Sequence, residues 1–95
     1  MGNYVARRLA VLLDEQPLWL DAMVELLRRM DVEVVGKTTH PSRALELVSE
    51  HNPDVFIASL RASDDELDGL SCVYQVAQKH SDVKRVVLSQ SSDSQ

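Results

Sequence analysis

Cysteine is almost absent from this sequence, because Cys72 is the only one among 95 residues. A lone cysteine excludes an internal disulfide and any metal site built from several cysteines. Such a chain folds without oxidation, and we expect it in a reducing, cytoplasmic compartment. Cys72 itself lies within a helical pattern, where it is expected to pack as a small side chain rather than to react as a thiol.

Long hydrophobic runs are absent as well. The apolar run at 9–13, near the N-terminus, is only five residues long before Asp14 and Glu15 interrupt it. Such a run is too short for the hydrophobic part of a signal peptide and for a membrane-spanning helix. We therefore expect no association with a membrane.

The chain also lacks an excess of positive charge. Its 10 Lys and Arg against 15 Asp and Glu give a formal net charge of −5, so direct attraction to a nucleic acid backbone is not expected. Hydrophobic residues make up 44% and charged residues 26% of the sequence, a composition typical of folded globular proteins. With no repeat and no interdomain linker, residues 1–95 are predicted to form one small domain that ends in a polar tail at 90–95.

Apolar residues alternate along the chain between the spacing of strands and the spacing of helices. Near-continuous apolar runs predict buried strands, and apolar residues three or four positions apart predict amphipathic helices. Strands are predicted at 8–13, 32–38, 54–60 and 84–89, and helices at 17–30, 41–51 and about 70–79. Pro17 and Pro41 suit the first turns of two helices, and Asn-Pro at 52–53 ends the second. This order predicts an α/β fold with a parallel sheet and right-handed crossovers.

The helical spacing also predicts which side chains are buried. The expected buried residues are Leu18, Ala22, Met23, Leu26 and Leu27 on the first helix, Ala44, Leu45, Leu47 and Val48 on the second, and Leu70, Val73, Val76 and Ala77 on the third. Beside the first of these faces lies a second stripe, Leu20, Val24 and Leu27, with Trp19 next to it. The stripe either widens the core face or, as Trp19, Leu20 and Val24, forms an exposed face for a partner. The sequence leaves both explanations open.

Polar side chains follow the predicted strands at the edge where ligands bind in such sheets. Asp14 and Glu15 follow the first strand, Ser59 stands at the end of the third and Ser89 at the end of the fourth. Two adjacent carboxylates repel each other and are favoured by a shared cation, and Mg²⁺ takes hard oxygen ligands of this type. Alternatively, Asp14 and Glu15 are solvated acids at a helix N-terminus, where the helix dipole favours negative charge.

Six short motifs follow one another along the chain. They are DEQPL at 14–18, EVVG at 33–36, ALELV at 44–48, PDV at 53–55, DGL at 68–70 and VVLS at 86–89. In this order and spacing, from about residue 8 to residue 89, they resemble the receiver domain of two-component response regulators, in the branch that precedes a LuxR/NarL-type helix-turn-helix. The resemblance implies a flavodoxin-like (CheY-like) doubly wound parallel sheet, here truncated after the fourth strand. We therefore expect the N-terminal part of a longer regulator, without the fifth strand and the final helices.

The resemblance also implies a site and a role for its residues. In the family a histidine kinase phosphorylates an aspartate at the end of strand three, Mg²⁺ is held by that aspartate and an acidic pair, and a Ser or Thr after strand four turns to the phosphoryl group. By position, Asp14 and Glu15 match the acidic pair, Ser59 the phosphoacceptor and Ser89 the switch hydroxyl. A serine brings no negative charge to the metal and is a poor nucleophile without a neighbouring base.

The serine at the acceptor position leads to the functional prediction. We predict a degenerate receiver, or pseudo-receiver, that is not an enzyme and that acts through protein contact or dimerisation without aspartyl phosphorylation. Mg²⁺ at Asp14 and Glu15 is expected to be weak or lost, since Mg²⁺ requires near-ideal octahedral geometry. The strand at 84–89 would lie at the sheet edge, where unpaired backbone groups favour a homodimer. Any DNA contact would belong to an output domain outside this chain.

Two other functions are consistent with the same residues. A conventional phosphorelay receiver would need a different acceptor, such as Asp64 or Asp65 in the acidic segment 63–68, although loop residues are poorly positioned for this chemistry. A small Mg²⁺-dependent hydrolase using Asp14 and Glu15 would need a third ligand and a nucleophile at a strand end. Incubation with a phosphodonor tests the first function, and metal titration with Asp14→Ala tests the second.

Overall fold

Four strands and three helices alternate along the chain in the computed structural model, which describes residues 8–61 and 66–90, with side chains except at positions 60, 61, 66–68, 89 and 90. They are β1 (Arg8–Asp14), α1 (Pro17–Arg29), β2 (Val32–Thr38), α2 (Pro41–His51), β3 (Val55–Arg61), α3 (Glu66–Lys79) and β4 (Lys84–Gln90). The predicted type and order of all seven elements are confirmed. β4 includes Gln90, which the sequence had assigned to the tail, and residues 91–95 of that tail lie outside the described residues.

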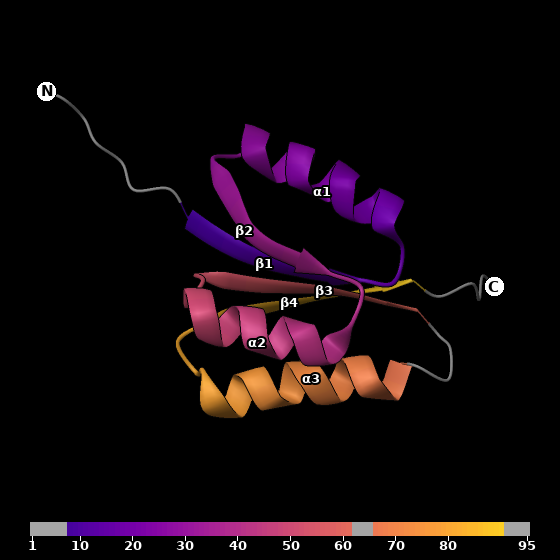
Figure 1. The fold of residues 1–95 in the computed structure, drawn as a ribbon, viewed down its shortest axis with the longest axis vertical. Helices are drawn as coiled ribbons and strands as arrows, with labels where there is room; N and C mark the ends of the chain where they lie inside the picture. Colours follow the sequence, from indigo (N-terminus) through magenta and orange to yellow (C-terminus); the bar gives the residue numbers. More distant parts are fainter. Residues whose placement is uncertain (1–7, 62–65, 91–95) are drawn as a thin grey trace, which may run out of the picture.

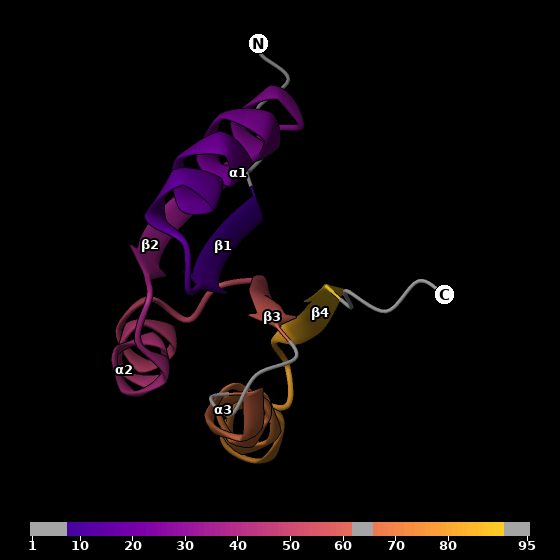
Figure 2. The same cartoon turned by 90° about the vertical axis from the view of Figure 1, so that its right-hand side faces the viewer.

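The strands form one parallel sheet in the order β2-β1-β3-β4. Helix α1 lies on one face over β1 and β2, and helices α2 and α3 lie side by side on the other face (Figures 1 and 2). The doubly wound α/β architecture expected from the sequence is therefore confirmed. β2 and β4 are the two edges of the described sheet.

Two clusters of buried apolar side chains lie on the two faces of the sheet. The larger cluster packs under α2 and α3, and its buried members are Val11, Leu13, Ala44, Leu47, Val48, Phe56, Ala58, Cys72, Val76 and Val83. The smaller cluster packs under α1 and consists of Leu12, Leu20, Leu27 and Ile57. Successive side chains of a strand point to opposite faces, so β1 and β3 supply both clusters. This double burial explains why their sequences are apolar without alternation.

The buried face of α1 differs from the one predicted. Leu20 is 4% exposed and packs in the smaller cluster, and Val24 is partly buried against it. Leu18 and Leu26, predicted to be buried, are 82% and 53% exposed. The stripe of Leu20 and Val24 is therefore part of the core, and the interpretation of these two residues as a partner face is wrong. Trp19, 47% exposed, remains accessible.

Charged residues of α1 show how this helix is oriented on the sheet. Apolar side chains surround α1 except along one stripe, which consists of Asp21, Glu25, Arg28 and Arg29. Asp21 accepts a hydrogen bond from Lys37 Nζ of β2 at 2.8 Å, so this stripe faces the β2 edge. The opposite flank, with Trp19, Leu26 and Met30, therefore faces the side of β3 and β4. Because apolar residues cover the helix everywhere except along the charged stripe, periodicity alone could not fix the rotation of α1 on the sheet.

Helix α3 also differs from its prediction at its first turn. It begins at Glu66 rather than near Leu70, so acidic residues assigned to a loop form its N-terminal turn. The helix dipole favours negative charge at that position. Leu70 is 43% exposed, although it was predicted to be buried, whereas Cys72 and Val76 lie in the core. The buried face predicted for α2 is confirmed, and its Ala44 is fully buried.

Asp54 fixes the relative positions of three strands at their amino-terminal ends. Its carboxylate Oδ2 accepts a hydrogen bond from the Leu9 N–H at 2.7 Å, and its own N–H donates to the Leu9 carbonyl at 2.8 Å. The Lys84 N–H donates to the Asp54 carbonyl at 3.0 Å. These bonds set the register of β1, β3 and β4, and thereby determine which residues meet at the opposite, carboxyl-terminal edge.

Candidate functional site at the carboxyl ends of the strands

Asp14 and Ser59 lie next to each other where β1 and β3 end. They are register partners in the parallel pairing of the two strands, so their side chains point to the same face of the sheet. Both line a cavity of about 10 Å³ under α1, together with Leu12, Leu13, Leu20, Met23 and Ile57. This volume is close to the least that holds one water molecule. The sheet therefore brings together two of the residues that the sequence proposed for one site.

The two members of the acidic pair differ in their surroundings. Asp14 is 6% exposed, and its Oδ1 accepts a hydrogen bond from the Gln16 N–H at 2.9 Å. This bond closes the turn that leads into Pro17, the first residue of α1. Glu15 is exposed to solvent. One oxygen of Asp14 is thus already used to order the backbone of the turn.

This set of donors does not match the preferences of Mg²⁺. The ion favours anionic oxygen ligands in octahedral geometry, whereas Ser59 contributes a neutral hydroxyl beside a single buried carboxylate. Among the side chains that the structure describes, no three of His, Cys, Asp or Glu come together as a candidate metal site. Beside Ser59, the site therefore offers a cation one buried negative charge, rather than the two that the adjacent residues Asp14 and Glu15 suggest.

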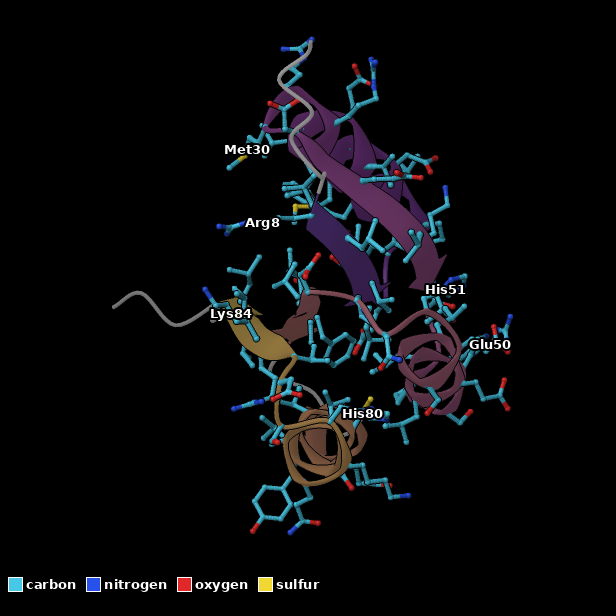
Figure 3. The ribbon with its side chains drawn as sticks, turned by 90° about the vertical axis from the view of Figure 1, so that its left-hand side faces the viewer. Arg8, Met30, Glu50, His51, His80 and Lys84 are labelled. Carbon is cyan, nitrogen blue, oxygen red and sulfur yellow. The ribbon has the colours of Figure 1, made fainter. Side chains whose placement is uncertain are left out.

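The reactivity of the Ser59 hydroxyl depends on whether a base accepts its proton. No hydrogen bond among the described side chains joins Ser59 to a histidine or a carboxylate. His51 and His80 lie at the opposite, amino-terminal edge of the sheet (Figure 3), where His80 Nε2 is 3.2 Å from Ser49 Oγ. A serine hydroxyl that is not hydrogen-bonded to a base is a weak nucleophile at neutral pH.

Other predicted site residues are described only in part. On β4 the residue level with Ser59 is Leu88, and Ser89 follows one position further along the strand. The Ser89 side chain lies outside the described residues, and so do Asp64 and Asp65, the alternative acceptors. The switch role of Ser89 and the acceptor role of Asp64 and Asp65 therefore stay predictions.

A groove between α2 and α3 was not foreseen from the sequence. Its volume is about 290 Å³, and it is lined by Pro41, Ser42, Leu45, Ser71, Cys72 and Gln75. Cys72 Sγ donates to the Pro41 carbonyl at 3.4 Å, and burial raises the pKa of its thiol to about 11. The thiol is therefore protonated at neutral pH, as expected for a packing residue. Contacts between two helices 30 residues apart give no signal in sequence periodicity.

Exposed apolar side chains gather on α1 and β4. On α1 they include Trp19 and Leu26, with Met30 at the C-cap, and on β4 Val86, Val87 and Leu88 are each about two-fifths exposed. Within the described residues, no helix covers the α1 side of β3 and β4 (Figure 2).

Among the helices in the described part of the chain, none combines the length and apolar character needed to cross a bilayer.

The sheet order, the placement of the helices and the acidic residues after β1 agree with one protein family. The family model of the response regulator receiver domain matches residues 10–95. The chain belongs to this family. The expectation drawn from the motifs is thereby confirmed, and the fold is a truncated CheY-like receiver fold with four of its strands.

Solved structures of response regulators share the receiver fold. A LuxR-family DNA-binding response regulator from Staphylococcus aureus is 25% identical, with a TM-score of 0.73 over 86% of this chain and 68% of its own. The isolated receiver domain of RcsB from Salmonella enterica serovar Typhimurium is 18% identical, with a TM-score of 0.78 over 93% and 65%. PhyR from Brucella abortus is 17% identical, with a TM-score of 0.74 over 86% and 33%.

The chain spans only part of the length of these proteins. It spans about a third of the Bartonella quintana and Brucella abortus PhyR chains and 63% of the Erythrobacter litoralis receiver chain. A search of curated protein sequences gave no match to the chain. The likeness to PhyR and RcsB, at less than 25% identity, concerns the fold alone.

Proposed function

We propose that this receiver is degenerate and signals through protein contact or self-association, without phosphorylation of an aspartate. The observation that carries the proposal is the pairing of Ser59 with Asp14 at the ends of β3 and β1. Ser59 occupies the strand end where the family carries its acceptor aspartate. A phosphoryl group cannot be stored there as an acyl phosphate, because the side chain has no carboxyl group.

The surroundings of Ser59 also disfavour transfer to its hydroxyl group. Phosphoryl transfer depends on positioning and on charge stabilisation by a metal ion. The Asp14 carboxylate already accepts the Gln16 N–H, and Ser59 has no hydrogen-bonded base within the described residues. Mg²⁺ binding at Asp14 and Glu15 is accordingly proposed to be weak or lost.

The output of the module is proposed to be a contact with protein. Receiver domains are signalling modules, and the match to a LuxR-family DNA-binding regulator supports a place in a transcriptional regulator. The net charge of −5 disfavours DNA contact by this chain itself, so DNA binding is assigned to an output domain outside it. A homodimer in the cytoplasm is the proposed working form.

Intact-mass spectrometry tests the absence of aspartyl phosphorylation. The chain is incubated with Mg²⁺ and a small phosphodonor such as acetyl phosphate, and the expected result is an unchanged mass. A Ser59→Ala variant treated in parallel shows whether any added group resides on Ser59.

Two outcomes of this experiment would contradict the proposal. A stable, acid-labile gain of one phosphoryl group shows aspartyl phosphorylation, and its survival in Ser59→Ala assigns it to another acceptor such as Asp64 or Asp65. An acid-stable gain that is lost in Ser59→Ala shows transfer to the serine hydroxyl, and would replace a degenerate receiver with one that uses a serine acceptor.

A further inference from the structure

Two neighbouring strands of the sheet end in the same kind of turn. Asp14 is the last residue of β1, and its Oδ1 accepts a hydrogen bond from the Gln16 N–H at 2.9 Å. Thr38 is the last residue of β2, and its Oγ1 accepts a hydrogen bond from the His40 N–H at 3.0 Å. In each turn the acceptor is a side-chain oxygen two positions before the donor, which is how short polar side chains order a backbone turn.

The backbone conformations of the two turns agree as well. Gln16 has a φ of −106° and a ψ of 115°, and His40 has a φ of −116° and a ψ of 125°. Both are extended N-cap residues, and each is followed by a proline, whose fixed φ suits the first position of a helix. In the described part of the chain, neither residue caps its helix with its own side chain. The carboxylate of β1 and the hydroxyl of β2 therefore have the same structural role.

Each turn fixes the position of the first buried residue of its helix. The Gln16 carbonyl accepts the Leu20 N–H at 3.2 Å, and the His40 carbonyl accepts the Ala44 N–H at 3.0 Å. Leu20 and Ala44 belong to the two core clusters on opposite faces of the sheet (Figure 2). The N-cap residue is thus held at its N–H by the turn and at its carbonyl by the helix. One kind of turn consequently places a helix on each face.

The turn after β2 shows that an acceptor oxygen is sufficient for this role. Thr38 is neutral, so its turn forms with neither a charge nor a metal ion. Asp14 is 6% exposed beside the neutral Ser59, and burial of a carboxylate costs free energy. Removing this charge while keeping an acceptor oxygen should therefore leave the turn into α1 intact.

We propose that Asp14 is a positioning residue of α1, a counterpart of Thr38 whose acceptor oxygen holds the first turn of the helix without need of its charge or of a metal ion. This inference rests on the proposed function, because it gives Asp14 a role in a receiver that does not use Mg²⁺. Leu20 lines the cavity beside Asp14 and Ser59, so the turn also shapes the candidate site. The position of α1 is then independent of Mg²⁺.

Amide hydrogen exchange of the isotope-labelled chain, followed by NMR, tests this role at the Gln16 N–H. Asp14→Asn and Asp14→Thr keep an acceptor oxygen and remove the charge, whereas Asp14→Ala removes both. The Gln16 amide is expected to exchange at the parental rate in the first two variants and faster by a factor of about ten or more in Asp14→Ala, because the bond no longer protects it. The melting temperature is expected to fall by about 5 to 10 °C in Asp14→Ala alone.

The matched control is Glu15→Ala, because Glu15 is the exposed member of the acidic pair. It is expected to change neither the exchange of the Gln16 amide nor the melting temperature. Thr38→Val applies the same test to the second turn, where the His40 amide should exchange faster while the Gln16 amide keeps its protection. In the parent chain, exchange at Gln16 is expected to be equal in EDTA and in Mg²⁺.

The possible results separate this role from the proposed function. Fast Gln16 exchange in Asp14→Asn and Asp14→Thr, without any response to Mg²⁺, would show that the charge is required and would overturn the positioning role alone. Parental exchange in Asp14→Ala would also overturn it, because the bond would not hold the turn. Slower exchange of the parent chain in Mg²⁺, absent from all three variants, would reveal a working metal site and overturn both proposals. If Asp14→Ala does not fold, Asp14→Asn and Asp14→Thr decide between charge and acceptor.

Discussion

Asp14 and Ser59 are paired in register at the ends of β1 and β3, and both line the same cavity under α1. An aspartate at position 59 would place a second carboxylate beside Asp14, which is only 6% exposed. Without a cation, the repulsion is expected to lower the free energy of unfolding of Ser59→Asp by about 1 kcal/mol. Mg²⁺ bound between the carboxylates should restore that loss, because it binds only the folded state.

Thermal unfolding in EDTA and in Mg²⁺ measures this effect. Ser59→Asn is the control, since it has nearly the same shape as the aspartate without its charge. The melting temperature of Ser59→Asp should rise with Mg²⁺ concentration, and those of Ser59→Asn and the parent chain should not. Equal stabilisation of the parent chain by Mg²⁺ would show that the metal site has survived.

Leu20 and Leu18 stand two positions apart on α1 but differ in exposure, at 4% and 82%. Leu20→Ala removes contacts with the smaller cluster and is expected to cost about 2 to 4 kcal/mol. Leu18→Ala should change stability by less than about 0.5 kcal/mol. Urea unfolding of both variants measures the difference. Similar losses for the two variants would mean that α1 is rotated from the orientation described.

Gly36 of β2 lies against the buried side chain of Leu47. A Cβ at position 36 would come within 3.0 Å of Leu47 Cδ2 and 3.1 Å of Cδ1. Gly36→Ala is therefore expected to lower stability by about 1 to 3 kcal/mol through overpacking. In a Leu47→Ala background the extra methyl meets a cavity, so the double variant should lose less than the sum of the single losses. Additive losses in urea unfolding would contradict this contact.

Burial raises the pKa of the Cys72 thiol to about 11. Above about pH 8.5 the unfolded thiol loses its proton while the folded one retains it, so the unfolded state binds fewer protons and stability falls as pH rises. The decline from this group is expected between about pH 8.5 and 11. Urea unfolding of the parent chain and of Cys72→Ala across this range isolates it. Parallel curves for the two proteins would refute it.

The local elements were predictable because their causes are local. Apolar runs gave the strands, Pro17 and Pro41 begin two helices, and Asn52 with Pro53 ends the second. Asn52 adopts a left-handed conformation with φ of 46°, which asparagine tolerates better than most residues. The start of α3 was missed because its acidic first turn resembles a polar loop, although such residues also suit a helix N-terminus.

The orientation of α1 could not be derived in this way. Apolar residues surround most of α1, so several rotations of the helix satisfy the same periodicity. The observed rotation depends on contacts with Leu12 and Ile57 and on the pairing of Asp21 with Lys37.

The sequence by itself determined the kinds of elements, their order, the family and the identity of the residue at the end of β3. Only the tertiary structure decided that Asp14 and Ser59 are neighbours, although 45 positions separate them, and that Leu20 is in the core while Trp19 is outside it. The physical reason is the distance in sequence over which the deciding interactions act. Helix and strand spacing arise from interactions between residues close in sequence, whereas strand register and helix rotation depend on the packing of distant segments.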